Sequence, residues 1–179
     1  MRTFIKEITH PFLKFGLSWY YSKPRKYHYD NSFVTVHPDV FPPQLTFSTK
    51  ILLDFIKDLY IQNKTFLELG CGSGILSIYA AKKGAIVTAT DINNIALEYL
   101  KKSAIDNNVV LTITESNLFE KLEKIAFDFI IINPPYYPKT ASTIKQKAWF
   151  CGENFEYFEQ LFNQIPSFIT SINEVYMIL

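Results

Sequence analysis

The sequence predicts an α/β protein whose mainly parallel, doubly wound sheet carries helices on both faces and reaches its fifth strand at the end of the chain. Two observations lead to this prediction. After residue 46, segments with strand character alternate with segments of helical period, a pattern that requires right-handed crossovers between parallel strands. Residues 127–133 (FDFIIIN) contain a continuous apolar run, which is typical of a strand buried on both faces. The 179 residues, 48% of them hydrophobic, suffice for one domain with a full core.

The first part of the chain is predicted to be an extension outside this alternation. Apolar residues recur with a loosely helical spacing over residues 4–21, which indicates a short docking helix. Residues 26–36 alternate β-branched and aromatic side chains around Asp30 and Asn31, and predict a hairpin. We therefore divide the chain into an N-terminal extension of short helix plus hairpin, residues 1–45, and a main domain, residues 46–179.

The main domain is expected to open with a helix over residues 48–62. Its N-cap is expected at Ser48 or Thr49, whose hydroxyl oxygens can accept from the first free N–H groups. Its buried stripe is expected to consist of Ile51, Leu52, Phe55 and Leu59. The elements that follow are a strand over 65–70, a helix over 74–83 closed by Gly84, a strand over 85–91, a helix over 93–104, strands over 109–115 and 127–133, a helix over 155–165 and a fifth strand over 174–179.

Charge and composition exclude several classes of function. Eighteen basic and seventeen acidic residues leave a net charge of +1, so the chain as a whole does not attract nucleic acid or an anionic membrane. The two cysteines, Cys71 and Cys151, stand in unrelated segments, and no Cys or His cluster has metal-ligand spacing. The sequence has neither a signal-peptide pattern nor an apolar window of about 18 residues. We therefore expect a cytoplasmic protein with reduced thiols, no metal and no membrane span.

The strongest motif is a glycine-rich turn, Glu68-Leu-Gly70-Cys-Gly72-Ser-Gly74, between a predicted strand and a predicted helix. Glycines let the backbone turn tightly and approach a ligand, and the start of the helix offers free N–H groups. A nicotinamide dinucleotide site would need a glycine where this chain has Ile75, and a P-loop would need Lys-Ser or Lys-Thr after the glycines. The motif therefore favours a different ligand.

Two carboxylates accompany the glycines. Glu68, at the tip of the first strand of the sheet, can compensate positive charge on a ligand or bind backbone N–H groups of the turn. S-adenosylmethionine carries such charge at its sulfonium and amino groups. Asp91 ends the second strand, 21 residues after Gly70, where a carboxylate can accept hydrogen bonds from both hydroxyls of a ribose. The structural alternatives are a tight turn without a ligand and a helix-capping role for Asp91.

A second motif, Asn133-Pro134-Pro135-Tyr136, follows the fourth strand directly, at the edge where open α/β sheets bind their ligands. The prolines fix the backbone, so that the Asn133 side-chain oxygen and the Pro134 carbonyl form two aimed acceptors. A planar NH2 group offers two N–H donors to such a pair, and Tyr136 can stack on a flat amide or base. The structural alternative is that the prolines only end the strand and that Tyr136 is an ordinary packed aromatic residue.

The motifs ELGCGSG, TATD and NPPY resemble those of Rossmann-like, class I S-adenosylmethionine-dependent methyltransferases that modify amino nitrogens, particularly the protein N5-glutamine methyltransferases that act on release factors. The resemblance covers roughly residues 40–179 and includes VFPPQLTFSTKILLDF, which is similar to the helix before that family's first motif. It implies S-adenosylmethionine as the cofactor and methyl transfer as the activity. It also implies that Asn117 and Leu118 contact the adenine ring.

Residues and resemblance together give two sets of candidate site residues. The catalytic candidates are Asn133, Pro134, Pro135 and Tyr136. The candidates for cofactor binding are Phe47, Ser48, Thr49, Glu68, Leu69, Gly70, Gly72, Gly74, Asp91, Ile92, Asn117, Leu118 and Asn133, of which the first three are implied to lie at the methionine end of the cofactor. Residues 137–151 follow neither period, contain three lysines and Trp149, and are expected to form a loop on the substrate side.

The chain departs from the family in two ways. The family's fold continues beyond the fifth strand with a helix and a hairpin, whereas this chain ends at Leu179, and the sequence leaves open whether it is truncated or a shortened variant. It also lacks the helical-bundle domain of the bacterial release-factor enzymes.

The expected reaction is methylation of a planar NH2 nitrogen, with a protein glutamine amide, for example of a release factor, as the leading substrate. One alternative is an RNA or DNA base, methylated at N6 of adenine or N2 of guanine after it has been flipped out of its stack. The other is a non-catalytic cofactor-binding module or a subunit that needs a partner. The sequence does not determine the oligomeric state.

Overall fold

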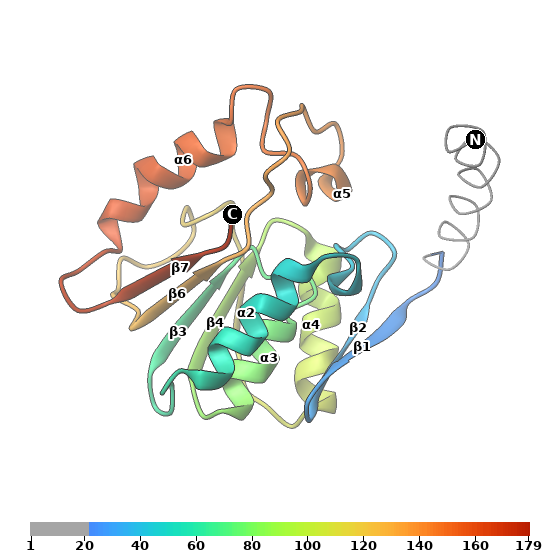
Figure 1. Ribbon diagram of the computed structural model, residues 1–179, viewed down its shortest axis with the longest axis vertical. Coiled ribbons are helices and arrows are strands. Elements are labelled where there is room, and N and C mark those ends of the chain that lie inside the picture. The colour runs from blue at the N-terminus through green and yellow to red at the C-terminus, as the bar shows by residue number, and fades with distance from the viewer. Residues whose placement is uncertain (1–21) are drawn as a thin grey trace, which may run out of the picture.

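A computed structural model describes residues 22–179, so the docking helix predicted within residues 4–21 lies outside the described residues. The centre of the fold is a sheet of five parallel strands in the order β5-β4-β3-β6-β7 (Figure 1). The predicted α/β class with a parallel sheet is thereby confirmed. The strands are β3 (Thr65–Leu69), β4 (Ile86–Asp91), β5 (Thr112–Glu115), β6 (Phe129–Ile132) and β7 (Glu174–Met177).

The strand order makes the sheet doubly wound. From β3 the chain proceeds outwards through β4 to β5, and it then returns to the other side of β3 for β6 and β7. The two halves of the sheet meet where β3 pairs with β6, with Leu69 opposite Ile132. Open α/β sheets bind ligands at the carboxyl edge of such a switch point. The glycine-rich turn after β3 and the NPPY motif after β6 therefore leave the sheet beside each other.

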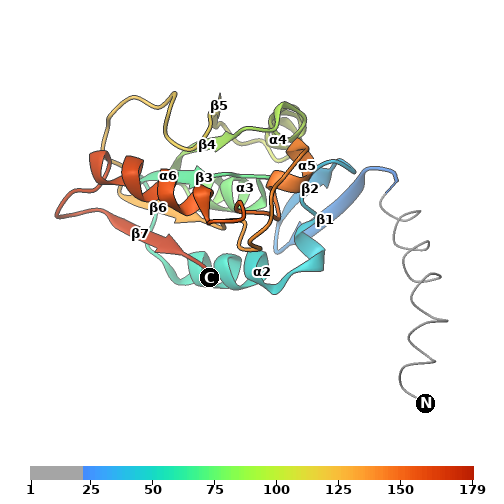
Figure 2. The same cartoon turned by 90° about the horizontal axis from the view of Figure 1, so that it is seen from above.

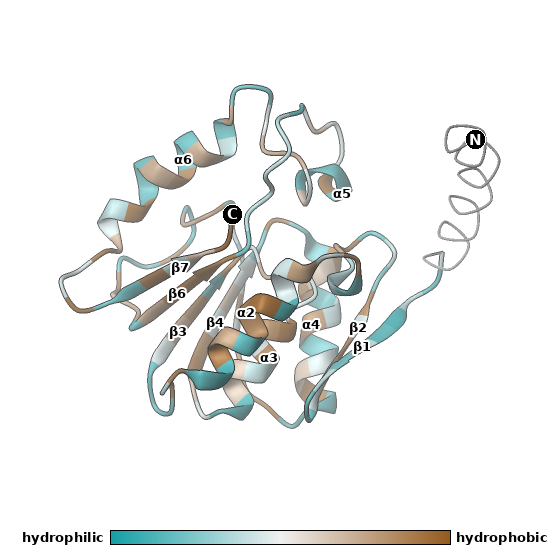
Figure 3. Cartoon of the chain, viewed as in Figure 1, coloured by the Kyte–Doolittle hydropathy of each residue, from teal (hydrophilic) through white to brown (hydrophobic). Residues whose placement is uncertain are grey.

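Helices cover both faces of the sheet, as predicted. Strand β6 shows the division, because Phe129 and Ile131 belong to the core on one face and Ile130 and Ile132 to the core on the other. The apolar run in the sequence is thus explained, since every side chain of β6 faces protein; β6 and β7 are largely brown in Figure 3. One face carries α2 (Phe47–Asp58), α3 (Ile75–Lys82) and α4 (Asn94–Asp106), and the other carries α6 (Glu156–Gln164) and the 3-10 helix η2 (Ile165–Ser167).

The predicted hairpin is present. Strand β1 (Arg25–Tyr29) pairs antiparallel with β2 (Ser32–Val36), and the turn between them contains Asp30 with a left-handed φ of 46°. Two views of the molecule, turned by 90°, place this hairpin on the side opposite to β7 (Figures 1 and 2). Val34 and Val36 of β2 are buried in the same core as α2, α3 and α4.

Strand β2 forms hydrogen bonds with a side chain of α4 and with that of its C-cap residue, Asn107. The Nδ2 of Asn107 donates to the carbonyl of Phe33 at 2.7 Å, and its Oδ1 accepts from the N–H of Phe33 at 3.2 Å. Ser103 Oγ accepts from the N–H of Thr35 at 3.3 Å. The backbone groups along the edge of a strand need such partners. Two polar side chains, one in α4 and one at its C-cap, therefore fix the hairpin to the main domain.

The prediction for α2 is wrong in its cap and its end, and of the predicted buried stripe only Leu52 is buried, with Leu59 partly buried. The helix ends at Asp58, and its N-cap is Thr46, not Ser48 or Thr49. The 3-10 helix η1 (Pro43–Leu45) precedes it. Its buried residues are Ser48, Thr49, Leu52, Leu53 and Ile56, which leaves the predicted core residues Ile51 and Phe55 exposed. Apolar residues occur on more than one side of this helix, so the period alone does not determine which side meets the sheet.

Residues 137–151 are more regular than predicted. Thr143 caps a single helical turn, α5 (Ile144–Lys147), by accepting a hydrogen bond from the N–H of Gln146 at 3.2 Å. Tyr137 and Phe150 form a parallel bridge that brings the two ends of the segment together. One helical turn is too short to produce a visible period in the sequence.

We expect Asn107→Ala to lower the free energy of unfolding by about 1 to 3 kcal/mol, because it leaves the N–H and the carbonyl of Phe33 without these partners. Urea denaturation measures the change. The neighbouring exposed residue provides the control, since Asp106→Ala should change the free energy by less than about 0.5 kcal/mol. Equal losses in the two variants would contradict the role given to Asn107.

Candidate active site

The glycine-rich turn leaves space for a ligand at two of its glycines. Gly70 and Gly72 have φ values of 74° and 50°, and a Cβ built on either would have no atom within 4 Å. Both line a cavity at the carboxyl edge of the sheet. Gly74 has a φ of 72° as well, but a Cβ there would collide with Leu100 of α4. Gly70 and Gly72 therefore leave the cavity open, whereas Gly74 is needed for the packing of α3 against α4.

Glu68 is a buried carboxylate at the base of this cavity. Its Oε2 accepts from the N–H of Ser77 at 2.8 Å and from the Ser77 hydroxyl, so it caps the first turn of α3. The backbone contact predicted for Glu68 was with the turn itself, whereas its backbone partner is Ser77 in the first turn of α3. Burial, and to a smaller extent the charge of Asp91, raise the pKa of Glu68 to about 8 against the lowering effect of the Ser77 hydrogen bonds.

Asp91 connects the end of β4 to the glycine-rich turn. Its Oδ2 accepts from the N–H of Gly72 at 2.7 Å, and its Oδ1 accepts from the N–H of Asn93 at 2.8 Å. Burial raises the pKa of Asp91, and the hydrogen bonds from the backbone oppose that effect. Glu68 and Asp91 form no ion pair with any residue in the range 22–179. The cavity thus contains two carboxylates whose ionised forms lack a cationic partner, an arrangement that favours a positively charged ligand.

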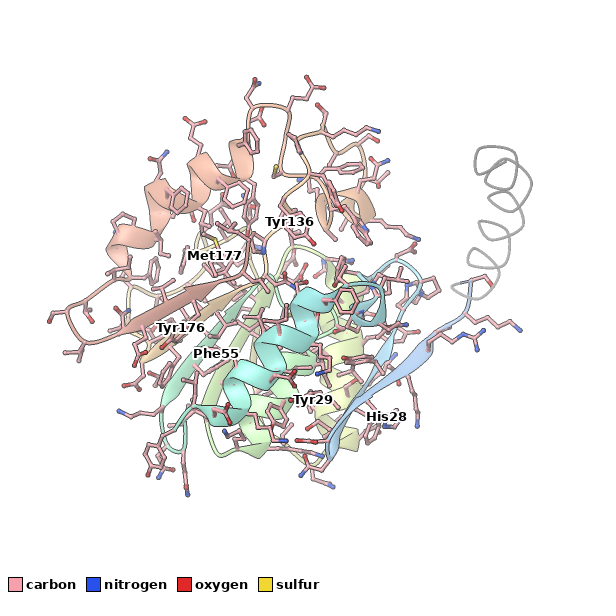
Figure 4. All side chains as sticks on the ribbon, viewed as in Figure 1. His28, Tyr29, Phe55, Tyr136, Tyr176 and Met177 are labelled. Atoms are coloured by element: carbon pink, nitrogen blue, oxygen red, sulfur yellow. The ribbon has the colours of Figure 1, made fainter. Side chains whose placement is uncertain are left out.

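The NPPY motif lines the same cavity. Asn133, Pro134, Pro135 and Tyr136 all belong to its wall. The Asn133 side chain makes no hydrogen bond within the part of the chain that the structure describes, so its amide is available to a ligand. Tyr136 is 37% exposed, lies beyond the carboxyl ends of the strands (Figure 4), and its ring is 5.2 Å from the ring of Tyr137.

The segment 137–151 meets the residues before α2 at the cavity. Phe41 and Trp149 both line it, and their ring centroids are 4.6 Å apart. Nearby, Lys145 Nζ forms an ion pair with Asp39 Oδ1 at 3.4 Å. These two contacts join segments that are about a hundred residues apart in the sequence. The contact between Phe41 and Trp149 forms part of the cavity wall.

Most of the predicted site residues line this one cavity. They are Thr49, Glu68, Gly70, Gly72, Asp91, Ile92, Asn117, Leu118, Asn133, Pro134, Pro135 and Tyr136. Four predicted cofactor contacts lie elsewhere. Phe47 is 84% exposed on the outside of α2, and Ser48 Oγ lies 3.2 Å from Thr46 Oγ1. Leu69 belongs to the hydrophobic core on one face of the sheet, and Gly74 packs on Leu100. Side chains of adjacent residues point in different directions. Thr49 therefore lines the cavity although Phe47 and Ser48 do not, and Gly70 lines it although Leu69 does not.

Several residues of the cavity wall were not predicted from the sequence, in particular Val40, Phe41 and Tyr157. Tyr157 reaches the cavity from α6, and both burial and the charge of Asp91 raise its pKa. Phe41 precedes the pair of prolines before α2, a position that the sequence marked only as a linker. Leu118 was predicted, but its left-handed φ of 51° has no signal in the sequence. Contacts of this kind depend on the tertiary fold.

Fold and site together define a class of protein, the S-adenosylmethionine-dependent methyltransferases of class I. A structure of such a methyltransferase from Agrobacterium tumefaciens matches 87% of this chain and 52% of its own chain, with a TM-score of 0.60 and 16% identity. A 16S rRNA N2 methyltransferase from T. thermophilus, solved in complex with AdoMet and guanosine, matches 70% of this chain and 36% of its own, with a TM-score of 0.56 and 22% identity. Because both identities are below 25%, these two structures show a common fold and do not by themselves assign a substrate.

The chain belongs to the methyltransferase small domain family, whose sequence model matches residues 31–151. The predicted family and the S-adenosylmethionine cofactor class are thereby confirmed.

Two relatives name different substrates. A protein from Methanocaldococcus jannaschii, provisionally named a protein N5-glutamine methyltransferase, is 43% identical over 105 residues, which are 58% of this chain and 50% of that protein. The ribosomal RNA small subunit methyltransferase C of Haemophilus influenzae is 33% identical over 129 residues, which are 66% of this chain and 38% of that protein. The chain thus spans half or less of these relatives.

Two features are absent from residues 22–179. None of the helices in this range combines the length and the apolar character needed to cross a membrane. The same range contains no group of three or more His, Cys, Asp or Glu side chains placed to hold a metal ion.

We expect the free energy of unfolding of the cofactor-free chain to fall as the pH rises from about 5 to about 8. The folded state holds a proton on Glu68 that the unfolded chain releases near pH 4.5, so this contribution is complete below pH 4.5 and is lost as the pH passes through about 8. At about 1.4 kcal/mol per pKa unit, the fall is roughly 2 to 4 kcal/mol. In Glu68→Gln, which keeps an acceptor for Ser77, urea denaturation should show a much smaller change. An equal fall in the variant would contradict this.

We expect Asp91→Ala to weaken S-adenosylmethionine binding by at least about tenfold in isothermal titration, because the glycine-rich turn loses an acceptor and the ribose loses its partner. Asp128→Ala is the matched control. Asp128 also accepts from a backbone N–H, that of Thr65 at 2.8 Å, but it does so at the opposite edge of the sheet. Its loss should lower stability and leave binding unchanged. Equal weakening in both variants would show that Asp91 acts only through stability.

Proposed function

We propose that this chain transfers the methyl group of S-adenosylmethionine to a planar NH2 nitrogen, and that the acceptor is the side-chain amide of a protein glutamine. One observation carries the proposal: a single cavity is lined both by the glycine-rich turn with its carboxylates and by the complete NPPY motif. The first group of residues suits the donor of the methyl group. The second suits a nitrogen with two N–H groups.

The residues of the cavity fit the cofactor. Burial raises the pKa values of Glu68 and Asp91, and a cationic ligand opposes that effect because it favours their ionised forms. The space beside Gly70 and Gly72 admits a close approach to the backbone. We assign the ribose to Asp91, the methionine end to the cavity near Glu68 and Thr49, and the adenine ring to the walls formed by residues such as Ile92, Asn117 and Leu118.

The NPPY motif would hold the acceptor. The Asn133 side-chain oxygen and the Pro134 carbonyl each accept one N–H of the amide, which fixes the nitrogen and directs its lone pair into the cavity. The ring of Tyr136 covers one flat face of the amide. Two consecutive prolines keep both acceptors in place without a change of backbone conformation.

The chemical step requires position more than acid or base catalysis. When bound, S-adenosylmethionine supplies a methyl group that its sulfonium already activates. The step forms a bond between nitrogen and carbon, breaks the bond between sulfur and carbon, and releases one proton from the nitrogen. Tyr136 is 37% exposed, so the proton can leave towards solvent at the mouth of the cavity. The contact between Phe41 and Trp149 limits the access of water on another side.

An RNA base is the second candidate acceptor. The relative from Haemophilus influenzae is named for ribosomal RNA, and Lys147 lines the same cavity as the exposed aromatic Tyr136. Aromatic rings that stack on a base and a lysine near a phosphate are common features of RNA sites. We favour glutamine because the relative named for it is more similar, at 43% identity, and because the net charge is only +1.

We expect Asn133→Ala to lower the rate of methyl transfer by at least about 100-fold while the dissociation constant of the cofactor changes by less than about threefold, because Asn133 positions the acceptor. Transfer of radiolabelled methyl to a glutamine-containing release-factor peptide and to a structured RNA measures the effect. Asn154→Ala is the control, since within residues 22–179 Asn154 hydrogen-bonds only to Glu156 on the surface and its loss should leave the rate unchanged.

The labelling pattern obtained with the unsubstituted chain distinguishes the three hypotheses, namely a glutamine acceptor, an RNA base as acceptor and a non-catalytic module. Label in the peptide supports the glutamine acceptor, and label in the RNA alone replaces it with a base. Cofactor binding without label in either would favour the non-catalytic module.

We further propose that residues 46–179 form the cofactor-binding domain, with residues 1–45 as an extension. We also propose that the protein acts in the cytoplasm, in keeping with its two buried free cysteines.

A further inference from the structure

An apolar stripe remains exposed on α2. Phe47, Ile51 and Phe55 are spaced four residues apart, so they share one side of the helix, and they are 84%, 55% and 37% exposed. At its far end the stripe reaches the edge of the sheet, where the ring of Phe55 lies 4.5 Å from that of Tyr176 on β7 (Figure 4). We call Phe47, Ile51 and Phe55 the α2 stripe. Single exposed apolar residues are ordinary, but a continuous row of them indicates a surface that binds something.

The α2 stripe is distinct from the part of α2 that faces the hairpin. On that part, Lys50 pairs with Asp54 at 2.5 Å, and the Tyr29 hydroxyl donates to Asp54 at 2.7 Å. These residues form a charged row that is already occupied by β1. The apolar row beside it has no such partner within residues 22–179, apart from the contact at Tyr176.

The course of β1 shows where the preceding chain leaves the fold. Strand β1 runs beside α2 in the same direction, because Tyr29 contacts Asp54 and the next residue, Asp30, pairs with Lys57 at 3.5 Å. The start of β1 therefore lies level with the N-terminal end of α2. This is the end at which the α2 stripe begins and is most exposed.

We propose that residues 1–21 of this chain dock on the α2 stripe. The segment is long enough, since α2 comprises 12 residues and residues 22–24 can serve as the connection. It also has the complementary chemistry, an apolar set at a loosely helical spacing, namely Phe4, Ile5, Ile8, Phe12, Leu13 and Phe15. Docking would bury both apolar rows and would cover the side of α2 opposite to the core.

The reactivity of an introduced thiol in the full chain tests this proposal. The native Cys71 and Cys151 are buried, with 5% and 1% exposure, so a cysteine placed on the surface is the main target of a maleimide. Ile51→Cys places a thiol in the α2 stripe. Ile105→Cys is the matched control, because Ile105 is an exposed isoleucine of another helix, α4. We expect the thiol at position 51 to react at least about tenfold more slowly than the one at position 105.

A second variant identifies what covers the stripe. In the Ile51→Cys chain, Phe12→Glu together with Leu13→Glu should raise the labelling rate to that of the control, because charged side chains cannot remain in an apolar contact. Equal labelling rates at positions 51 and 105, measured with residues 1–21 unchanged, would overturn the proposal. Slow labelling that the glutamates do not change, or that becomes faster on dilution, would overturn it too, since the stripe would then be covered by another element or by a second copy of the chain.

Discussion

The parallel pairing of β3 with β6 is the constraint on which the site depends. It places the loop after β3 beside the loop after β6, although their motifs are about sixty residues apart in the sequence. The pairing is stable because β6 is apolar along its whole length and each of its residues is buried between two layers of helices. A fully buried central strand thus brings the glycine-rich turn and the NPPY motif into one cavity.

Electrostatics explain why this cavity suits a cationic cofactor. Two carboxylates point towards the same space, and both are used to organise the backbone, Glu68 at the start of α3 and Asp91 at the glycine-rich turn. Their raised pKa values show that the fold holds them in surroundings that oppose their charge. Groups in this condition are common at functional sites. A positively charged ligand in the cavity would offset this cost in stability.

The sequence predicted the features that depend on local chemistry. The alternation of elements, the apolar run of β6, the glycine-rich turn and the NPPY motif each have a signature of residue type and spacing, and the structure contains all of them. The sequence failed where the tertiary fold decides. It did not show which side of α2 faces the sheet, since Ile51 and Leu53 are equally apolar and only Leu53 is buried. Nor did it identify Tyr157 or Phe41, which reach the cavity from segments without a motif.

The substrate is a separate question from the class, because one relative is named for a protein acceptor and another for ribosomal RNA. The most direct test is a crystal structure of the chain with S-adenosylhomocysteine. The account predicts the ribose at Asp91 and the sulfur facing Asn133 across the cavity. A ligand bound outside this cavity, or with its sulfur directed away from the NPPY motif, would contradict it.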